Sequence, residues 1–260
     1  MEIERIAGSL GARVEGVDLT RFDDATRDAL RDALHTHLVL VVPGPVLDPD
    51  ALLTVARGFG EPQVHPVVPH VEGHPGVIEI RNFGKRVTLN EHWHSDVTFE
   101  AKPPKLTLLQ AHTVPEAGGD TQFANQVQAF EELSEGMQAL LSGLRAVHSG
   151  AALARVMGRD APEEVVHPVL RTHPETGHRA LYVCRAFTQR FEGMTAEESR
   201  PLLDFLYAWG TRPHLTARVR WSPGDLVIWD NRCVQHYAIH DHGDAERVLL
   251  RVTVEGEVPS

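Results

Sequence analysis

The residues most suited to chemistry form a His-x-Asp pair, His94 and Asp96, in the stretch HWHSDVTFE. In an extended strand, residues two positions apart point the same way, so this imidazole and this carboxylate would converge. A histidine from a distant segment would complete a facial triad, and His236 in WDNRCVQHY is the best candidate. Three protein ligands suit Fe(II), because three positions stay open for a co-substrate and oxygen. The pattern predicts a mononuclear non-haem iron site.

The pair alone does not decide the matter, because a chain with 16 histidines produces such spacings easily. The alternative is a pair on the surface, or a pair whose hydrogen bonds are satisfied in the core. Two arginines favour a site. Arg247 and Arg251 lie four positions apart in the strand-like stretch ERVLLRVTVEG, so both guanidinium groups would share one face. Buried arginines are costly unless an anion meets them, and their planar fork pairs with carboxylate or sulfonate.

Hydrophobic periodicity alone supports a different orientation of this strand. In that alternative both arginines face solvent, and the core face is formed by Val248, Leu250, Val252 and Val254.

The composition excludes several classes of function. The formal net charge is -11 and no run of Lys and Arg offsets it, so we expect neither nucleic-acid nor membrane binding. Two cysteines make no disulfide framework and suit a reducing cytosol. The start of the chain does not read as a signal peptide, and no stretch approaches the roughly 18 apolar residues of a membrane span. We therefore predict a cytoplasmic protein.

Periodicity and turn residues place these groups on a mainly β scaffold with flanking helices. A capping box at Thr195 to Glu198 precedes the last expected helix, and Pro201 favours a start later than that box. We expect helices over 23–35, from Asp48 or Asp50 to Val55, over 125–133, 135–141 and 202–209. We expect strands over 38–42, 77–81, 106–111, 165–171, 179–183, 217–221, 225–229 and 247–254. The two strands 165–171 and 179–183 are expected to form a hairpin.

Five stretches resemble the TauD/TfdA family of iron(II)- and 2-oxoglutarate-dependent dioxygenases. They are HPVVPH (65–70), NEHWHSDVTF (90–99), GGDT (118–121), FTQR (187–190) and WDNRCVQHYAIHDHGDAERVLLR (229–251). They occur in the family's order and span most of the chain. The resemblance implies one TauD/TfdA-like dioxygenase domain over 1–260, folded as a double-stranded β-helix, or jelly roll.

The resemblance also implies a role for each matching residue. His94, Asp96 and His236 match the iron ligands. Thr121 and Arg247 match the residues that hold the distal carboxylate of 2-oxoglutarate. The positions that match the family's substrate side are His65, Asn90, Phe187 and Arg251, and Arg251 matches an arginine that binds the anionic head group in several members.

The implied reaction uses Fe(II), 2-oxoglutarate and O2, hydroxylates a small anionic organic substrate, and releases succinate and CO2. The implied substrate is a sulfonate, an alkyl sulfate or an aryloxy acid, and homo-oligomers are common in the family. Val68 stands where taurine dioxygenase carries a tyrosine, and the segment after His148 is short and apolar. Both departures favour a substrate with a more apolar tail than taurine.

Arg185, in YVCRAFTQR, is either a second anion clamp or a solvated strand residue. Two other functions compete with the dioxygenase. A zinc- or manganese-dependent hydrolase or isomerase on the same scaffold would have no need for Thr121 with Arg247. A non-catalytic anion-binding module would be indicated by the loss of a metal ligand, and the chain retains all three.

Overall fold

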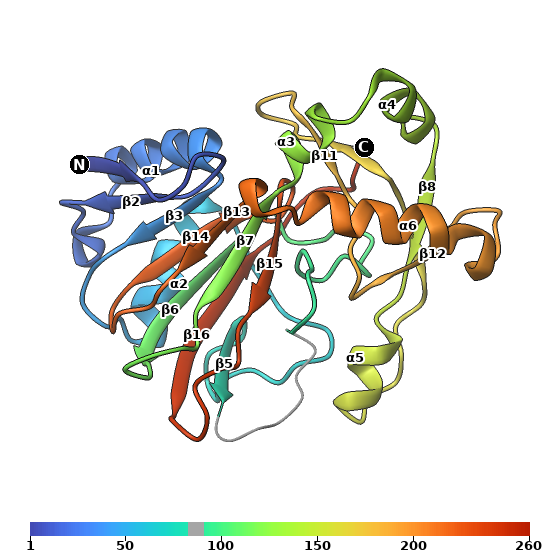
Figure 1. The fold of residues 1–260 in the computed structure, drawn as a ribbon. Coiled ribbons are helices and arrows are strands. Elements are labelled where there is room, and N and C mark those ends of the chain that lie inside the picture. Colours follow the sequence, from blue (N-terminus) through green and yellow to red (C-terminus); the bar gives the residue numbers. More distant parts are fainter. Residues whose placement is uncertain (83–90) are drawn as a thin grey trace.

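The computed structural model describes residues 1–82 and 91–260, and its largest element is an eight-stranded sheet (Figure 1). Its order is β1 (Glu2–Arg5), β2 (Ala12–Glu15), β3 (Val39–Val42), β14 (Leu226–Asp230), β6 (Leu106–Thr113), β16 (Arg247–Val254) and β4 (Pro62–Gln63), with β5 (Val77–Asn82) also paired to β16. All its strand pairs are antiparallel except β2 with β3.

Three smaller sheets complete the β structure. The one that matters for the site has the order β13 (Thr216–Val219), β7 (Thr121–Asn125) and β15 (Val234–Ala238). Another has the order β12 (Thr188–Phe191), β8 (Arg145–His148) and β9 (Val165–Pro168), and a hairpin joins β10 (Leu170–Thr172) to β11 (Arg179–Leu181).

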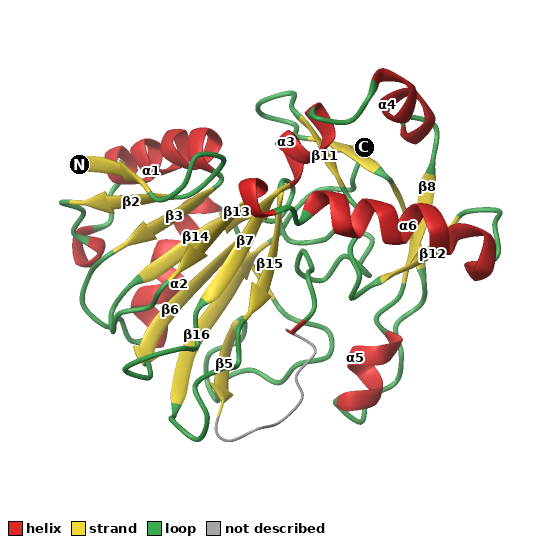
Figure 2. Ribbon diagram, viewed as in Figure 1, coloured by secondary structure: helices red, strands yellow, loops and turns green. Residues whose placement is uncertain are grey.

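Helices flank these sheets (Figure 2). They are α1 (Asp24–His37), α2 (Pro49–Phe59), α3 (Gln126–Glu131), α4 (Glu135–Leu141), α5 (Ala151–Val156) and α6 (Ala196–Gly210), with short 3-10 turns at Leu19–Arg21 and Pro213–Leu215. Side chains cap the first turns of several of them: Asp23 accepts from the Thr26 amide before α1, and Asp48 accepts from the Ala51 amide before α2. In the described part of the chain, every helix is too short or too polar to span a lipid bilayer. The expected β scaffold with flanking helices is confirmed.

The large sheet carries an apolar core on each face, which decides the orientation of β16. One core packs α1 and α2 against residues such as Leu250 and Val252, and the other packs β7 and β15 against residues such as Leu249. All eight residues of β16 are buried. Periodicity expected one apolar face and one solvent face, but here both faces are covered. Arg247 and Arg251 therefore lie inside the protein, and the solvent-facing alternative is wrong.

Two local expectations need correction. The stretch from Val165 to Arg171 is not one strand, because β9 pairs with β8 while β10 forms the hairpin with β11. Helix α6 begins at Ala196, directly after a complete capping box between Thr195 and Glu198, and it contains Pro201. The two reciprocal cap hydrogen bonds outweigh the single helix hydrogen bond that a proline so near the start removes.

Candidate metal centre

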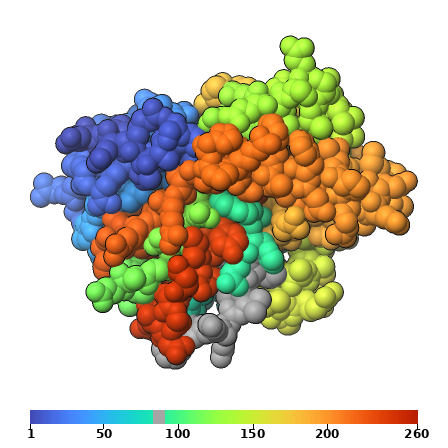
Figure 3. Space-filling view, in the orientation of Figure 1, coloured from blue at the N-terminus to red at the C-terminus, as the bar shows by residue number. Residues whose placement is uncertain are grey.

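His94, Asp96 and His236 converge in the structure, although they come from distant segments. Their ligand atoms lie within 4.8 Å of one another, and all three residues are buried. Asp96 Oδ1 is 3.9 Å from His94 Nε2 and 3.8 Å from His236 Nε2. An isolated β-bridge between His94 and His236 on β15 aligns the two rings, with amide-to-carbonyl distances of 3.1 and 2.7 Å. Figure 3 shows the red C-terminal strands beside the blue-green middle of the chain.

The local backbone differs from the strand expected for HWHSDVTFE. Only His94 forms a bridge, and the residues from Asp96 to Phe99 form a turn. Val97 has a φ of 51°, in the left-handed region that a β-branched residue rarely adopts. Such a conformation costs on the order of 1–3 kcal/mol and persists only where packing enforces it. Val97 is buried in a cluster with Phe99 and Phe187, and this packing holds the turn.

The electrostatics of the cluster suit a divalent cation. His94 Nδ1 lies 2.7 Å from the His92 carbonyl oxygen and donates to it, so the lone pair of His94 is on Nε2. Burial lowers the pKa of His94, and it lowers the pKa of His236 to about 3, so both rings are neutral at pH 7. Burial opposes ionisation of Asp96, but Arg251, the two histidines and Thr107 outweigh it and hold the pKa below its usual value. Two neutral imidazoles and a carboxylate fit a three-ligand Fe(II) site.

Beside this cluster lies a polar corner made by β7 and β16. The buried Arg247 donates from Nε to the Gly119 carbonyl at 2.9 Å, and its Nη2 lies 3.5 Å from Thr121 Oγ1. Trp221 Nε1 donates to the same Thr121 oxygen at 3.1 Å, which leaves the Thr121 proton for another acceptor. Burial lowers the pKa of Arg247 to about 10, so it stays charged at pH 7. A narrow cavity connects Arg247 and Thr121 with His94 and His236.

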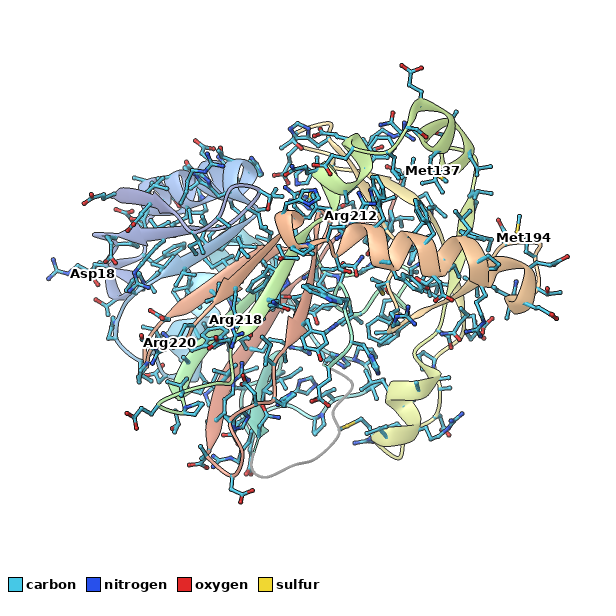
Figure 4. The ribbon with its side chains drawn as sticks, viewed as in Figure 1. Asp18, Met137, Met194, Arg212, Arg218 and Arg220 are labelled. Carbon is cyan, nitrogen blue, oxygen red and sulfur yellow. The ribbon has the colours of Figure 1, made fainter. Side chains whose placement is uncertain are left out.

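Polar contacts fix the turn that leads into Thr121. The Gly119 amide donates to Asp241 Oδ1 at 2.8 Å, and Asp120 accepts from Arg218 Nε at 2.5 Å. Arg218, on β13, is labelled in Figure 4. Gly118 has a φ of 80°, and a Cβ there would lie 2.5 Å from the Asp241 carboxylate. The GGDT stretch therefore needs glycine at this position for both its backbone conformation and its space.

A second cavity, of about 330 Å³, opens on the other side of the metal-ligand cluster. Arg251 and His65 lie in its wall beside Asp96. Arg251 Nη1 is 3.2 Å from Asp96 Oδ1, and its buried Nε has no hydrogen-bond partner among the described residues. His65 Nδ1 accepts from the Val67 and Val68 amides, both at 3.0 Å, so its proton is on Nε2. Burial, followed by Arg251, lowers the pKa of His65 to about 3. The cavity thus contains two donors for an anion.

Most of the remaining wall of this cavity is apolar, and Glu79, Arg81 and Asn82 on β5 add a polar part. Phe187 is buried against Phe99, with ring centroids 5.1 Å apart, and its ring also packs against His94 at 6.0 Å. The sequence did not decide whether the segment after His148 lines the pocket, and in the structure α5 and the residue after it supply part of the wall. The apolar residues of the wall include Val68, Val97, Phe99, Leu153, Val156, Met157 and Phe187.

Two expected substrate residues are not in the described cavity. Asn90 lies outside the described residues. Arg185 is 53% exposed, pairs with Asp204 on α6 at 3.2 Å, and packs over the Tyr207 ring at 5.0 Å. Arg185 is thus a surface residue in this structure and is not part of the lining of the described cavity.

Three residues that contact the site were not selected from the sequence. Thr107 and Asn231 hydrogen-bond Asp96, and Asn82 on β5 lies 3.3 Å from Arg247 Nη1. Asn231 stands inside WDNRCVQHY, directly beside the predicted ligand segment, so the motif could have indicated it. Thr107 and Asn82 carry no such signal, because each lies in an ordinary β-strand stretch.

One other group in the described part of the chain has metal-binding residue types at close range: His173, Asp230 and Cys233. Here Arg232 already occupies the position of a cation. It donates from Nε to Asp230 Oδ1 at 2.8 Å and from Nη2 to Oδ2 at 2.6 Å. His173 Nε2 is 3.0 Å from Asp230 Oδ2, while its Nδ1 accepts two backbone amides. This cluster does not fit a metal site.

Comparisons with known proteins agree with this geometry. Residues 2–253 match the family described as taurine catabolism dioxygenase TauD, TfdA family. The chain is 37% identical to an alpha-ketoglutarate-dependent sulfate ester dioxygenase from Pseudomonas putida, where alpha-ketoglutarate is another name for 2-oxoglutarate. This alignment of 276 residues covers 100% of this chain and 91% of that protein. A taurine dioxygenase from Burkholderia xenovorans has a TM-score of 0.89 and 36% identity, covering 99% of this chain and 92% of that one. The structure of AAD-2 with Mn(II) and N-oxalylglycine matches this chain with a TM-score of 0.87 and 25% identity. The match covers 100% of this chain and 99% of that one.

Proposed function

The chain belongs to the TauD/TfdA family and is an Fe(II)- and 2-oxoglutarate-dependent dioxygenase that acts on small anionic substrates, and we propose that its substrate is an alkyl sulfate ester. The observation that carries the substrate proposal is the cavity of about 330 Å³, with Arg251 and His65 at one part of its wall and the apolar side chains of α5 at another. A charged head and an apolar chain match those two parts. The relative from Pseudomonas putida, named for sulfate esters, supports the same class.

We propose that His94, Asp96 and His236 hold the iron, through His94 Nε2, His236 Nε2 and Asp96 Oδ1. When bound there, Fe(II) would activate O2. This activation couples two reactions: 2-oxoglutarate is oxidised to succinate and CO2, and the substrate is hydroxylated. Arg247 and the Thr121 hydroxyl bind the distal carboxylate of 2-oxoglutarate. Arg247 suits this role because its charge is buried with no carboxylate hydrogen-bonded to it among the described residues.

On the substrate side, Arg251 and His65 orient the sulfate group. Both present N–H donors, and the neutral His65 adds a hydrogen bond without a second positive charge beside the metal site. Hydroxylation of the carbon that carries the sulfate ester gives an unstable hydroxy ester. Its C–O bond to sulfate breaks, the hydroxyl loses its proton, and the products are an aldehyde and inorganic sulfate. Phe99, Phe187 and Val97 exclude water from this part of the cavity.

We further propose that residues 1–260 form one domain with the double-stranded β-helix architecture. Support comes from the core that β7, β13 and β15 share with one face of the large sheet. A homo-oligomer and a cytoplasmic location stay predictions from the sequence.

A survey of succinate release tests the substrate proposal. We expect alkyl sulfates of medium chain length to be turned over at least about tenfold more efficiently than taurine, because taurine leaves the apolar wall unfilled and brings an ammonium group into it. Equal turnover of taurine and an alkyl sulfate would contradict the proposal.

The variant Leu153→Asp tests the apolar wall directly. It should raise KM for a long alkyl sulfate by roughly tenfold and leave methyl sulfate unaffected, because a carboxylate placed beside the alkyl chain costs about 1–3 kcal/mol. The matched control is Leu140→Asp on α4, where the leucine is 52% exposed and lies outside the cavity lining. A uniform effect on both substrates, or an effect of the control, would show that α5 does not contact the chain.

The variant Thr121→Val tests the co-substrate corner and the competing hydrolase. Removing one hydrogen bond to a carboxylate should raise KM for 2-oxoglutarate by about tenfold to a hundredfold. Anaerobic addition of Fe(II) and 2-oxoglutarate to the wild-type protein should give a metal-to-ligand charge-transfer band. Absence of this band together with zinc-dependent hydrolysis would favour the hydrolase or isomerase.

A further inference from the structure

Only one oxygen of Asp96 faces the two histidines, and the other is engaged elsewhere. Asp96 Oδ2 lies 2.6 Å from Thr107 Oγ1 on β6, while Oδ1 faces His94 Nε2 and His236 Nε2. Asp96 is 2% exposed and Thr107 is 0% exposed, so water does not compete for either side chain. This contact determines how the carboxylate can be used.

The amide of Asn231 fixes the direction of that contact. Its Oδ1 accepts from Trp229 Nε1 at 2.9 Å and from the Asp96 amide at 3.2 Å. Oxygen and nitrogen of a side-chain amide are distinguished by their partners, and two N–H donors on one side identify the oxygen. Asn231 Nδ2 therefore points the other way, toward Thr107 Oγ1 at 2.7 Å.

The position of every relevant proton follows from this arrangement. Thr107 Oγ1 accepts a hydrogen bond from Asn231 Nδ2, and a hydroxyl has one proton of its own to donate. Its remaining close partner is Asp96 Oδ2 at 2.6 Å, so the hydroxyl donates to this carboxylate oxygen. The chain of donors runs from Trp229 through Asn231 and Thr107 to Asp96.

We infer that Thr107 and Asn231 are positioning residues that hold Asp96 as a one-oxygen ligand of the metal. This inference rests on the proposed iron site at His94, Asp96 and His236. A carboxylate that bound through both oxygens would take a further coordination position. With Oδ2 held by Thr107, three positions stay open for 2-oxoglutarate and O2. Outer partners of metal ligands typically change metal affinity by about 10–100-fold when they are removed.

Equilibrium binding of Mn(II) alone, followed by loss of the free-ion electron paramagnetic resonance signal, tests this inference without any turnover. Thr107→Val keeps the volume and removes the hydroxyl, so Mn(II) should bind about 10–100-fold more weakly. Thr107→Ser keeps a hydroxyl at this position, so its affinity for Mn(II) should lie within about threefold of the wild-type affinity. We treat differences smaller than this as ordinary variation between variants.

Asn231→Asp gives an independent second variant of nearly equal volume. The new carboxylate still accepts from Trp229, but it also accepts from Thr107, so the hydroxyl proton turns away from Asp96. Affinity for Mn(II) should fall by at least the same factor as in Thr107→Val. The matched control is Thr188→Val, which removes a buried hydroxyl that accepts from the Cys184 amide at 2.9 Å and does not contact Asp96.

The outcomes separate the inference from the proposed function. If wild type binds Mn(II), His94→Ala does not, and Thr107→Val binds as tightly as wild type, the inference is overturned while the metal site stands. If Thr188→Val weakens binding as much as Thr107→Val, the effect is general destabilisation and the inference is likewise overturned. If the wild-type protein itself does not bind Mn(II), the proposed metal site fails, and the inference fails with it.

Discussion

Two buried clusters in this protein contain the same residue types and have opposite uses. The metal-ligand cluster is His94, Asp96 and His236, and the ion-paired cluster is His173, Asp230 and Arg232 with Cys233 beside them. Both contain a fully buried aspartate whose pKa lies below its usual value. In both, burial opposes ionisation and neighbouring positive or donating groups outweigh it.

The difference lies in what neutralises each aspartate. Arg232 contacts both oxygens of Asp230, at distances from 2.6 to 2.8 Å, and His173 approaches to 3.0 Å. Asp96 is contacted by an arginine at one oxygen only, with Arg251 Nη1 3.2 Å from Oδ1, and the histidine nitrogens lie 3.8 and 3.9 Å from that oxygen, beyond hydrogen-bond distance. In the ion-paired cluster, both oxygens of the aspartate are therefore hydrogen-bonded to the arginine. In the metal-ligand cluster, two histidine nitrogens stay close to one aspartate oxygen without a hydrogen bond to it, an arrangement that suits a bound cation.

The comparison teaches that residue type and proximity do not identify a metal site. A metal site is better identified by which histidine nitrogen carries the proton and which carries the lone pair. His94 donates from Nδ1, so its Nε2 is available as a ligand. His173 instead accepts at Nδ1 and donates from Nε2. The same accounting that argues against a metal at His173 supports the one proposed at His94.

The largest expected effect comes from removing a metal ligand. His236→Ala should lower succinate release by about 10³-fold or more, because the ion supplies several kcal/mol of stabilisation to the reaction and loses one of three protein ligands. The fold should persist, since His236 Nδ1 has no hydrogen-bond partner among the described residues. Steady-state assays and near-ultraviolet circular dichroism measure the two properties. Near-normal activity would place the metal elsewhere.

Breaking the ion-paired cluster should have the reverse profile. Arg232→Met leaves Asp230 as a buried, uncompensated charge and should lower the free energy of unfolding by about 3–5 kcal/mol. Mn(II) affinity of the folded protein should not change, because Arg232 contacts none of the metal-ligand cluster. Urea denaturation gives the first quantity. Adding Asp230→Asn to Arg232→Met should recover part of the lost unfolding free energy, because the uncompensated charge is removed. If the effects of the two substitutions simply add, Arg232 and Asp230 do not interact as proposed.

The stability that Asp230 supplies should also depend on acidity. Its pKa is lower in the folded than in the unfolded chain, so its contribution is present above about pH 4 and is lost as the pH falls through the lower, folded pKa. The difference in unfolding free energy between wild type and Asp230→Asn should therefore shrink by about 1–2 kcal/mol between pH 6 and pH 3. Urea titrations at both pH values measure it. A difference that grows in acid would mean that Asp230 is protonated in the folded protein.

The sequence predicted the ligand set better than the local structure that presents it. The prediction that groups His94 and Asp96 with His236 assumes that HWHSDVTFE is a strand. In the structure a turn, with Val97 at a φ of 51°, brings the three residues together instead. No periodicity indicates a left-handed valine, because packing against Phe99 and Phe187 enforces it. The family's motif order carried the prediction where local propensity could not.

The orientation of β16 shows the same limit in the fold. Alternation along RVLLRVTV favoured one apolar face, and the sequence gives no direct sign that a second sheet covers the other. Only the core shared by Leu249, Phe123 and Val234 makes Arg247 and Arg251 interior residues. By contrast, helix caps such as the Thr195 box depend on neighbours in sequence, so the box is predicted correctly, although the later helix start favoured by Pro201 is wrong.

Arg185 provides the smallest expected effect and extends the comparison to the surface. It pairs with Asp204 at 3.2 Å, as Arg232 pairs with Asp230, but 53% of its side chain and 47% of that of Asp204 are exposed. Solvent screening reduces such a pair to a contribution of about 0–1 kcal/mol. Arg185→Ala should therefore change the unfolding free energy by under about 1 kcal/mol, and KM for an alkyl sulfate should stay within about twofold of the wild-type value.

Arg251→Ala, measured in the same assay, should raise KM for the alkyl sulfate by about tenfold or more, since it removes a charged hydrogen bond of about 1.5–3 kcal/mol. Equal effects of the two variants would mean that Arg185 reaches the substrate in solution.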